Sequence, residues 1–362
     1  MQPLNIVIYN ITPPGGVERV AINLANMLVD TFQVNIVSLF SSAGQPFYPL
    51  DKRVQVTHLG VPFVPGLRHY LRQNTQALRA LRQQVHFSPD TITLGMSVNM
   101  NLLLALLKRS GASGRFIGCE HMNYDDAGRV AQGLRRLTYP LLDEVVVLTE
   151  AEQRVFHERL GLKVQVIPNQ LPLLPAQPAT LAEKRLLAVG RYSDPKGFDR
   201  LLPAIIPLMR DFPDWRLDLF GKGEQEEDLK QQITQSGLSN IGLHSPTADV
   251  EREYLSSSVY LLPSRFEALP MVVLEAQACG LPVVAYDSSN GPRALVNSEN
   301  GFLIPDGDGP AFAEAVRQLI TDPELRRTKG AAARRDAMQF APEVIRQKWL
   351  DLLRPEGPSH SS

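Results

Sequence analysis

Apolar runs of strand length alternate with segments of helical period along the whole chain. In the segment after the first apolar run, Val20, Ala21, Leu24, Ala25 and Leu28 recur at three- and four-residue spacing and form one apolar stripe. Such alternation is typical of a parallel α/β sheet covered by helices. In the first half of the chain it predicts strands over residues 4–11, 33–40, 54–58, 91–95, 116–120 and 144–149.

A proline-rich segment over residues 168–178 interrupts this alternation, and we expect it to form an extended linker. The pattern then restarts, which predicts two Rossmann-like domains in tandem, over residues 1–170 and 179–341. A last helix is expected over 342–354 and a disordered tail over 355–362. The second half is predicted to contain strands at 185–190, 216–220, 259–263, 282–286 and 302–304, and helices at 198–209, 224–235, 270–279 and 310–321.

Composition narrows the class of protein. The 362 residues are 44% hydrophobic and 21% charged with a net charge of −1, which is ordinary for a globular protein and argues against nucleic acid as the main partner. The two cysteines, Cys119 and Cys279, are far apart and exclude a disulfide framework or a thiolate zinc site. Polar residues interrupt the longest apolar runs, and the N-terminus has no signal-peptide pattern. We therefore expect a cytoplasmic protein without membrane spans.

Charge is distributed unevenly, because the first half is net positive and the second net negative. No carboxylate occurs between Asp51 and Asp90, and this stretch, 52–86, is a candidate contact with an anionic surface. A solvated helix face is the alternative. The cations of the stretch are Lys52, Arg53, Arg68, Arg72, Arg79 and Arg82, joined by His58, His69 and His86.

Ligands of open parallel sheets lie beyond the carboxyl ends of the strands, so polar residues at those junctions are site candidates. Gly15 and Gly16 stand between the first strand and its helix, where backbone N–H groups and the helix N-terminus favour a phosphate. His121 follows strand 116–120 and has the chemistry to exchange a proton with a reacting hydroxyl. A plain turn and a structural histidine remain the alternatives at this stage.

Two junctions of the second half carry charged candidates. Arg191 and Lys196 follow strand 185–190, five residues apart, and suit a diphosphate, although taken alone they are more typical of solvated surface charges. Glu267 lies in the loop before helix 270–279 and Glu275 inside that apolar helix, where a carboxylate is costly unless it has partners. Backbone N–H groups from Ala268 and Leu269 onward face the same space as the two carboxylates.

These motifs together resemble the family 4 glycosyltransferases, retaining enzymes of the GT-B fold, over nearly the whole chain. The most specific motif is E-x7-E, from Glu267 to Glu275. The supporting motifs are Gly-Gly-x-Glu-Arg from Gly15, Val-Gly-Arg followed by Lys-Gly around 189–197, Phe-Gly-x-Gly at 220–223 and Asn-Gly-Phe-Leu at 300–303. The resemblance implies two Rossmann-like domains facing across a cleft, with the last helix crossing back to the first domain.

The resemblance also implies roles for the matching residues. Arg191 and Lys196 would bind the donor diphosphate, and Glu275 the nucleotide ribose. Glu267 would lie against the transferred sugar, and His121 would contact its hydroxyls near the anomeric carbon. Gly15 and Gly16 would approach the phosphates. Glu267 would thus stabilise an oxocarbenium-like sugar while Arg191, Lys196 and N–H groups stabilise the leaving diphosphate, so neither a metal nor another cofactor is required.

The implied reaction moves a hexose or N-acetylhexosamine from a nucleotide donor, with UDP favoured, to a saccharide or lipid-linked acceptor in surface polysaccharide or lipopolysaccharide synthesis. The net positive half would then be the acceptor half. Its basic stretch, 52–86, would support peripheral attachment to the anionic inner face of the membrane.

Three alternatives remain open from the sequence. Asp306-Gly307-Asp308 formally matches the DxD motif of metal-dependent transferases, although its glycine-rich setting near the C-terminus suggests a turn. A non-enzymatic sugar-binding protein also has two such lobes, but would ignore a nucleotide. A UDP-sugar epimerase shares the fold and would also bind UDP, so product analysis is needed to distinguish it.

Overall fold

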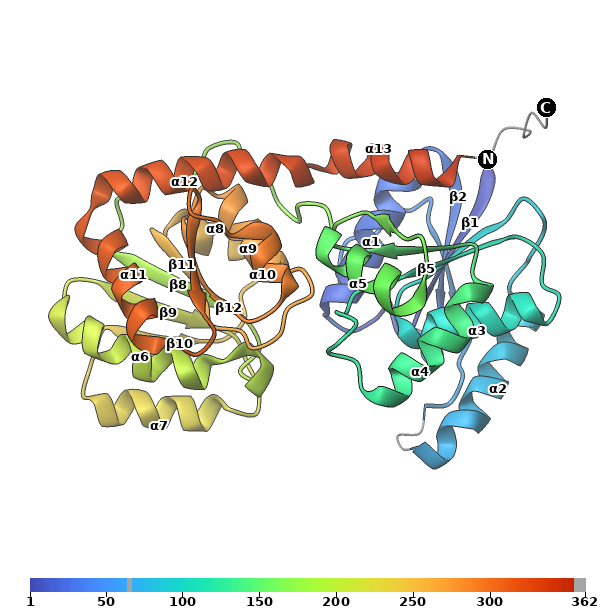
Figure 1. Cartoon of the computed structure of the whole chain (residues 1–362), viewed down its shortest axis with the longest axis horizontal. Helices are drawn as coiled ribbons and strands as arrows, with labels where there is room; N and C mark the ends of the chain where they lie inside the picture. The colour runs from blue at the N-terminus through green and yellow to red at the C-terminus, as the bar shows by residue number, and fades with distance from the viewer. Residues whose placement is uncertain (64–66, 355–362) are drawn as a thin grey trace. The chain divides into compact units, whose positions relative to one another are not determined.

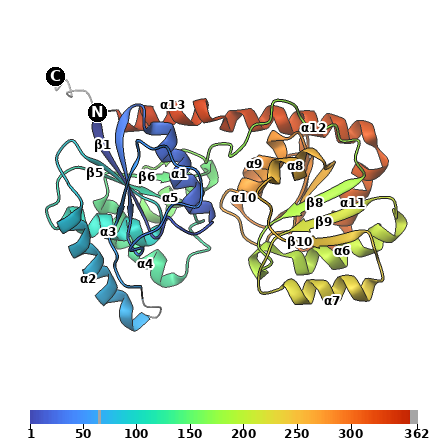
Figure 2. The same cartoon turned by 180° about the vertical axis from the view of Figure 1, so that it is seen from behind.

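The computed structural model describes residues 1–63 and 67–354, so the tail predicted over 355–362 lies outside the described residues. The chain divides into two compact units. The first contains Met1–Gln170 together with the helix that begins at Pro342, and the second contains Leu171–Ala341. Figures 1 and 2 show a sheet with helices on both faces in each unit.

The first unit is built on a seven-stranded parallel sheet of order β3-β2-β1-β4-β5-β6-β7. The chain order reverses between β1 and β4, and loops that follow the two strands at such a point leave room for a ligand. The elements are β1 Gln2–Ile8, α1 Gly16–Leu28, β2 Phe32–Ser38, β3 Gln55–His58, α2 Leu67–Gln84, β4 Ile92–Gly95, α3 Val98–Arg109, β5 Arg115–Cys119, α4 Arg129–Thr138, β6 Glu144–Val147, α5 Glu150–Leu160, β7 Gln165–Val166 and α13 Pro342–Leu353.

Alternate residues of β1 supply the two apolar layers of this unit. Leu4, Ile6 and Ile8 pack against α1 and α13, whereas Val7 faces the layer formed with α2 and α3. The apolar side of α13 is buried in the first of these layers, which makes the last helix part of the first unit's core (Figure 1).

The second unit has a six-stranded parallel sheet of order β10-β9-β8-β11-β12-β13. Helices α6 and α11 pack on one face, while α9, next to α8 and α12, covers the other (Figure 2). The elements are β8 Arg185–Val189, α6 Phe198–Asp211, β9 Arg216–Phe220, α7 Glu226–Ser236, β10 Ile241–His244, α8 Val250–Leu255, β11 Val259–Leu262, α9 Met271–Ala278, β12 Val283–Asp287, α10 Asn290–Leu295, β13 Gly301–Pro305, α11 Gly309–Thr321 and α12 Pro323–Ala337.

Two parallel α/β sheets confirm the predicted fold class, with local differences. The first strand was predicted to reach residue 11 but ends at Ile8, because Asn10 bends the chain by accepting a hydrogen bond from the backbone N–H of Thr12. The pattern missed β10, a four-residue edge strand that contains Gly242. Among the described residues, no helix is both long and apolar enough to span a bilayer.

Candidate active site

Three of the four charged candidates in the second unit follow the carboxyl ends of neighbouring strands. Arg191 and Lys196 come after β8, and Glu267 comes after β11. Because β8, β11 and β12 are adjacent and parallel, the loops at their carboxyl ends share one edge of the sheet. The fold therefore gathers side chains that are more than seventy residues apart in the sequence, such as Lys196 and Glu267.

Lys196 and Glu267 form the centre of this site. The Lys196 ammonium donates a hydrogen bond to Oε1 of Glu267 at 2.7 Å, and the Ser264 hydroxyl donates to the same oxygen at 2.8 Å. Ser289, which follows β12, fixes the loop: its hydroxyl accepts from the Glu267 N–H at 3.0 Å and donates to the Glu267 carbonyl at 2.8 Å. Neither serine was predicted, because single serines in loops carry no distinctive sequence signal.

Two glycines allow these loops to approach one another. Gly197 follows Lys196 with a φ of +70°, and a Cβ there would lie 2.1 Å from the carbonyl oxygen of Pro263. A Cβ on Gly291 would lie 2.6 Å from the carbonyl oxygen of Glu267. Any larger residue at either position would push the Glu267 loop away from its neighbours.

The two remaining charged candidates differ in exposure. Arg191 is exposed, and its guanidinium makes no ion pair within residues 1–63 and 67–354. Glu275 is only 2% exposed on α9, and the Tyr254 hydroxyl donates to its Oε2 at 2.7 Å. This hydrogen bond provides the kind of partner that the sequence analysis required for a carboxylate in an apolar helix.

The backbone around the start of α9 offers donors at the same edge. The helix begins at Met271, and its N-cap residue, Pro270, makes no side-chain capping hydrogen bond. Ala268 and Leu269 lead into it directly after Glu267. Uncapped N–H groups at a helix start interact favourably with anionic or hydroxyl-bearing ligands.

In the first unit, Gly15 and Gly16 lie at the start of α1. Gly15 is the N-cap residue and has no side chain of its own to cap the helix, but the Glu18 carboxylate lies over it, because a Cβ on Gly15 would meet Oε2 of Glu18. A Cβ on Gly16 would meet no atom within 4 Å, so open space surrounds that position. The loop after β1 is therefore open beside Gly16, whereas the Glu18 carboxylate already lies beside Gly15.

His121 follows β5, on the same sheet edge as the α1 N-terminus. Its Nε2 is buried and has no hydrogen-bond partner among the described residues. Burial lowers the pKa of His121 to about 4, so the imidazole is uncharged at neutral pH. A neutral ring with an unused nitrogen suits a hydrogen bond to a ligand hydroxyl better than an ionic contact.

A buried network fixes the loop that carries His121. Glu120 is 2% exposed, and its Oε2 accepts a hydrogen bond from Arg135 at 2.6 Å. Its Oε1 accepts from Tyr139 and, at 3.4 Å, from Asn101. Burial raises the pKa of the Glu120 carboxyl against the attraction of Arg135. Neither Glu120 nor Arg135 was predicted from the sequence as part of the site.

The segment Asp306-Gly307-Asp308, which matches the DxD motif, forms a turn before α11. Asp306 forms a 2.7 Å ion pair with Arg200, and Gly307 has a φ of +80°. The Asp308 side chain caps α11 by accepting from the Ala311 N–H at 3.0 Å. Across the described ranges, no group of three or more His, Cys, Asp or Glu side chains is arranged to hold a metal ion.

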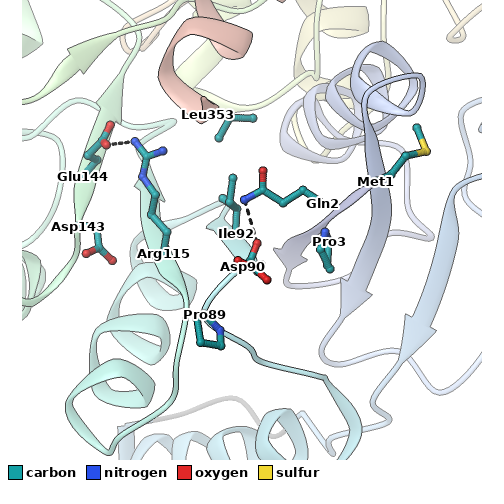
Figure 3. Close-up of a pocket in the computed structure, with 10 residues that line it drawn as sticks. All are labelled: Met1, Gln2, Pro3, Pro89, Asp90, Ile92, Arg115, Asp143, Glu144 and Leu353. Carbon is teal, nitrogen blue, oxygen red and sulfur yellow. Dashed lines mark hydrogen bonds and ion pairs between the residues drawn. The ribbon is translucent and has the colours of Figure 1, made fainter. Parts of the chain in front are cut away.

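A pocket of about 670 Å³ lies away from these residues, at the opposite edge of the first sheet (Figure 3). Most of its lining residues lie at or just before the amino ends of strands, and Leu353 ends α13, whereas His121 and Gly15 follow the carboxyl ends of strands. The Arg115–Glu144 ion pair occupies one side, and Gln2 donates to the Asp90 carbonyl at 2.9 Å on the other. None of the predicted site residues lines this pocket.

Comparison with known proteins identifies the family of the chain. Residues 14–172 match the model described as glycosyltransferase family 4, and residues 175–336 match glycosyl transferases group 1. An uncharacterized glycosyltransferase of Haemophilus influenzae is 32% identical over 361 residues, covering 98% of this chain and 100% of the relative. The chain therefore belongs to the family 4 glycosyltransferases and is an enzyme of that class, as the motifs predicted.

Two further matches are similar over nearly the full length. A Campylobacter jejuni enzyme named as an α-1,4-N-acetyl-D-galactosaminyltransferase acting on a PP-undecaprenol-linked saccharide is 24% identical over 345 residues, covering 94% of this chain and 95% of the relative. The crystal structure of a Staphylococcus aureus TarM mutant with Fondaparinux, α-GlcNAc-glycerol and UDP has a TM-score of 0.82 at 14% identity, covering 98% of this chain and 100% of that one. The TarM likeness supports the GT-B fold.

Proposed function

We propose that this glycosyltransferase moves a hexose or N-acetylhexosamine from a UDP donor, with retention, to a saccharide or lipid-linked acceptor in surface polysaccharide or lipopolysaccharide synthesis. The observation that carries the proposal is the cluster of Lys196, Ser264 and Glu267 beside the uncapped start of α9. It places a cation, a carboxylate and backbone donors at one sheet edge, which suits an anionic leaving group next to a sugar.

Departure of the nucleoside diphosphate builds negative charge on its phosphate oxygens, and the Lys196 ammonium stabilises that charge. The ammonium has three donors, so it can keep its 2.7 Å contact with Glu267 and still donate to a phosphate oxygen. Arg191 adds a guanidinium fork for the same diphosphate. We also assign the N–H groups at Gly15 and Gly16 to the donor phosphates. In this proposal no metal ion or other cofactor takes part.

The remaining roles concern the sugar and the ribose. Glu267, oriented by Ser264 and Ser289, stabilises positive charge that develops on the transferred sugar. His121 offers its neutral imidazole to the sugar hydroxyls. Glu275 accepts hydrogen bonds from the ribose of the donor.

The choice of donor and acceptor rests on similar proteins. The similar TarM structure contains UDP, and the Campylobacter jejuni relative is named for an acceptor carried on PP-undecaprenol. An acceptor of that kind brings a diphosphate and a lipid with it. The exposed cations of the first unit complement such an acceptor.

The function is tested with the full chain, UDP- and GDP-sugars, and a panel of saccharide and lipid-linked acceptors. We expect one UDP-sugar to give an α-linked product, with turnover retained in EDTA because the diphosphate is neutralised by Lys196 and Arg191. Turnover lost in EDTA and restored only by manganese would contradict the metal-free site. Conversion of the donor sugar without transfer would favour an epimerase, and sugar binding that ignores nucleotides would favour a receptor.

The basic stretch gives a second part of the proposal, peripheral binding to an anionic membrane. The side chains of Arg72, Arg79 and Arg82 are exposed on α2, and Lys52 is exposed before β3. Arg53 is a weaker contributor than the sequence implied, because it pairs with Asp30 at 2.7 Å and with Asp51 at 2.8 Å. The side chains of Arg68 and His69 lie outside the described residues.

Reversing two of these charges is expected to weaken vesicle binding. The variant Arg72→Glu with Arg79→Glu should bind vesicles of anionic lipid at least about tenfold more weakly at low salt, since each cation near the surface contributes roughly 1 kcal/mol. Sedimentation with vesicles measures this. The control is Arg154→Glu with Arg159→Glu, which makes the same charge change on the exposed side of α5. Equal binding to neutral vesicles, or equal loss in the control, would contradict membrane attachment through 52–86.

A further inference from the structure

Tyr254 of α8 contacts Glu275, the second glutamate of the E-x7-E motif, which lies on α9. The tyrosine is fully buried. Its hydroxyl donates to Oε2 of Glu275 at 2.7 Å, across a sequence separation of 21 residues. Asp249 caps the start of the short helix α8, because its side chain accepts a hydrogen bond from the Arg252 N–H.

The surroundings of Tyr254 keep its hydroxyl protonated. Burial, followed by the charge of Glu275, raises the pKa of Tyr254 well above its ordinary value, so the hydroxyl stays protonated and donates at every physiological pH. The ring lies 5.7 Å from that of Tyr260, whose hydroxyl donates to the Val189 carbonyl at 3.2 Å. Val189 ends β8, the strand that leads into Arg191.

A buried carboxylate on an apolar helix needs such a partner for its orientation. Rotation about the last side-chain bond of glutamate is soft, so packing alone does not select the direction of the two oxygens. A hydrogen bond to an ionised group is about twice as strong as one between neutral groups, and it fixes that rotation. Without the Tyr254 hydroxyl, Oε2 of Glu275 would lose this donor in a site that is only 2% exposed.

We propose that Tyr254 is a positioning residue for nucleotide binding: its hydroxyl holds the Glu275 carboxylate in the orientation that receives the ribose hydroxyls of the donor. This inference rests on the proposed function, because it assumes that Glu275 contacts ribose. Tyr254 itself touches no substrate and acts through Glu275.

The test compares a nucleotide that has ribose hydroxyls with one that lacks them. UDP and 2′,3′-dideoxy-UDP are titrated into the full chain and into Tyr254→Phe by calorimetry, with GDP and its dideoxy form in parallel to select the tighter base. We expect Tyr254→Phe to weaken the ribonucleotide about tenfold, as for loss of a hydrogen bond to a charged group. The dideoxy form should bind both proteins equally. KM for the nucleotide-sugar should rise and kcat should change little.

Two controls separate positioning from a general structural effect. Tyr286→Phe removes the hydroxyl of another buried tyrosine of the same unit, one that packs against Phe312, and should leave both affinities unchanged. In a Glu275→Gln background, Tyr254→Phe should cost little more, because the ionised acceptor is already gone. Thermal unfolding of each variant checks that the unit is folded.

The outcomes distinguish the positioning role of Tyr254 from the proposed function of the site. If Glu275→Gln weakens UDP and Tyr254→Phe does not, or if Tyr254→Phe weakens UDP and the dideoxy form equally, the positioning role is overturned and the proposed function stands. If the unmodified chain binds UDP and 2′,3′-dideoxy-UDP equally, or binds neither UDP nor GDP, the proposed contact between Glu275 and ribose is itself wrong.

Discussion

Replacing Lys196 with alanine is expected to lower kcat/KM for the nucleotide-sugar donor by about a hundredfold to a thousandfold, the usual cost of removing one preorganised donor to a developing anion. The effect should fall mainly on kcat, since the charge on the diphosphate grows as the glycosidic bond breaks. Glu267 would also lose its 2.7 Å partner, although its side chain is only 11% exposed and lies beside the leaving group. Steady-state kinetics with the donor identified by the nucleotide-sugar screen measure the loss.

Lys184 provides the matched control for this prediction. It is exposed at the opposite end of β8 and pairs with Asp214, so Lys184→Ala removes an ammonium from the same unit without touching the site. Lys184→Ala should retain turnover within about twofold, as expected for a surface substitution. Comparable kcat/KM values for Lys196→Ala and Lys184→Ala would contradict the assignment of the diphosphate to Lys196.

The Arg135→Met variant is expected to show the largest loss of stability. Arg135 is fully buried, and its removal leaves the Glu120 carboxylate, which is 2% exposed, without its ion-pair partner. Breaking a buried pair by removing one partner typically costs about 3–5 kcal/mol. Arg135 also donates to the Tyr124 carbonyl at 3.1 Å, so the loop that carries His121 should loosen. Urea unfolding measures the free energy, and amide exchange of residues 120–127 measures the loop.

The pH dependence of this variant has a defined sign. Burial raises the pKa of Glu120 in the folded state, and without Arg135 it rises further, so the folded protein binds that proton more tightly than the unfolded chain. Lowering the pH from 7 toward 5 should therefore recover part of the lost stability. Glu120→Gln added to Arg135→Met should recover part of it at pH 7. The neighbouring exposed Arg136→Met is the control, and equal stability of Arg135→Met and Arg136→Met would contradict the ion-pair argument.

Much of the fold could be predicted because apolar periodicity is a local property of the sequence. Strands such as β5 and β9 are buried runs with clear boundaries, and the pattern placed them to within a residue or two. β10 was missed because it is a short edge strand and includes a glycine, features that weaken the strand signal. The two-residue β7 is too short to give any period.

The site was less accessible from the sequence, because its contacts join distant segments. Nothing local indicates that Lys196 and Glu267 touch, and the family resemblance assigned them to different parts of the donor without predicting a contact between them. Tyr254 and Arg135 were missed, since a tyrosine or an arginine inside a helix looks the same whether it faces solvent or a buried carboxylate. Pairing of such residues depends on which helix covers which strand, and only the folded structure provides that.

The place of α13 in the first unit has a consequence for synthesis. Ile345, Trp349 and Leu353 complete the apolar layer beneath α1, and Arg346 donates to the Met27 carbonyl at 3.2 Å. A ribosome makes these residues only after the whole second unit has been produced. The unit whose translation starts first therefore completes its hydrophobic core last. Until α13 emerges from the exit tunnel, the nascent first unit exposes the apolar surface that this helix covers.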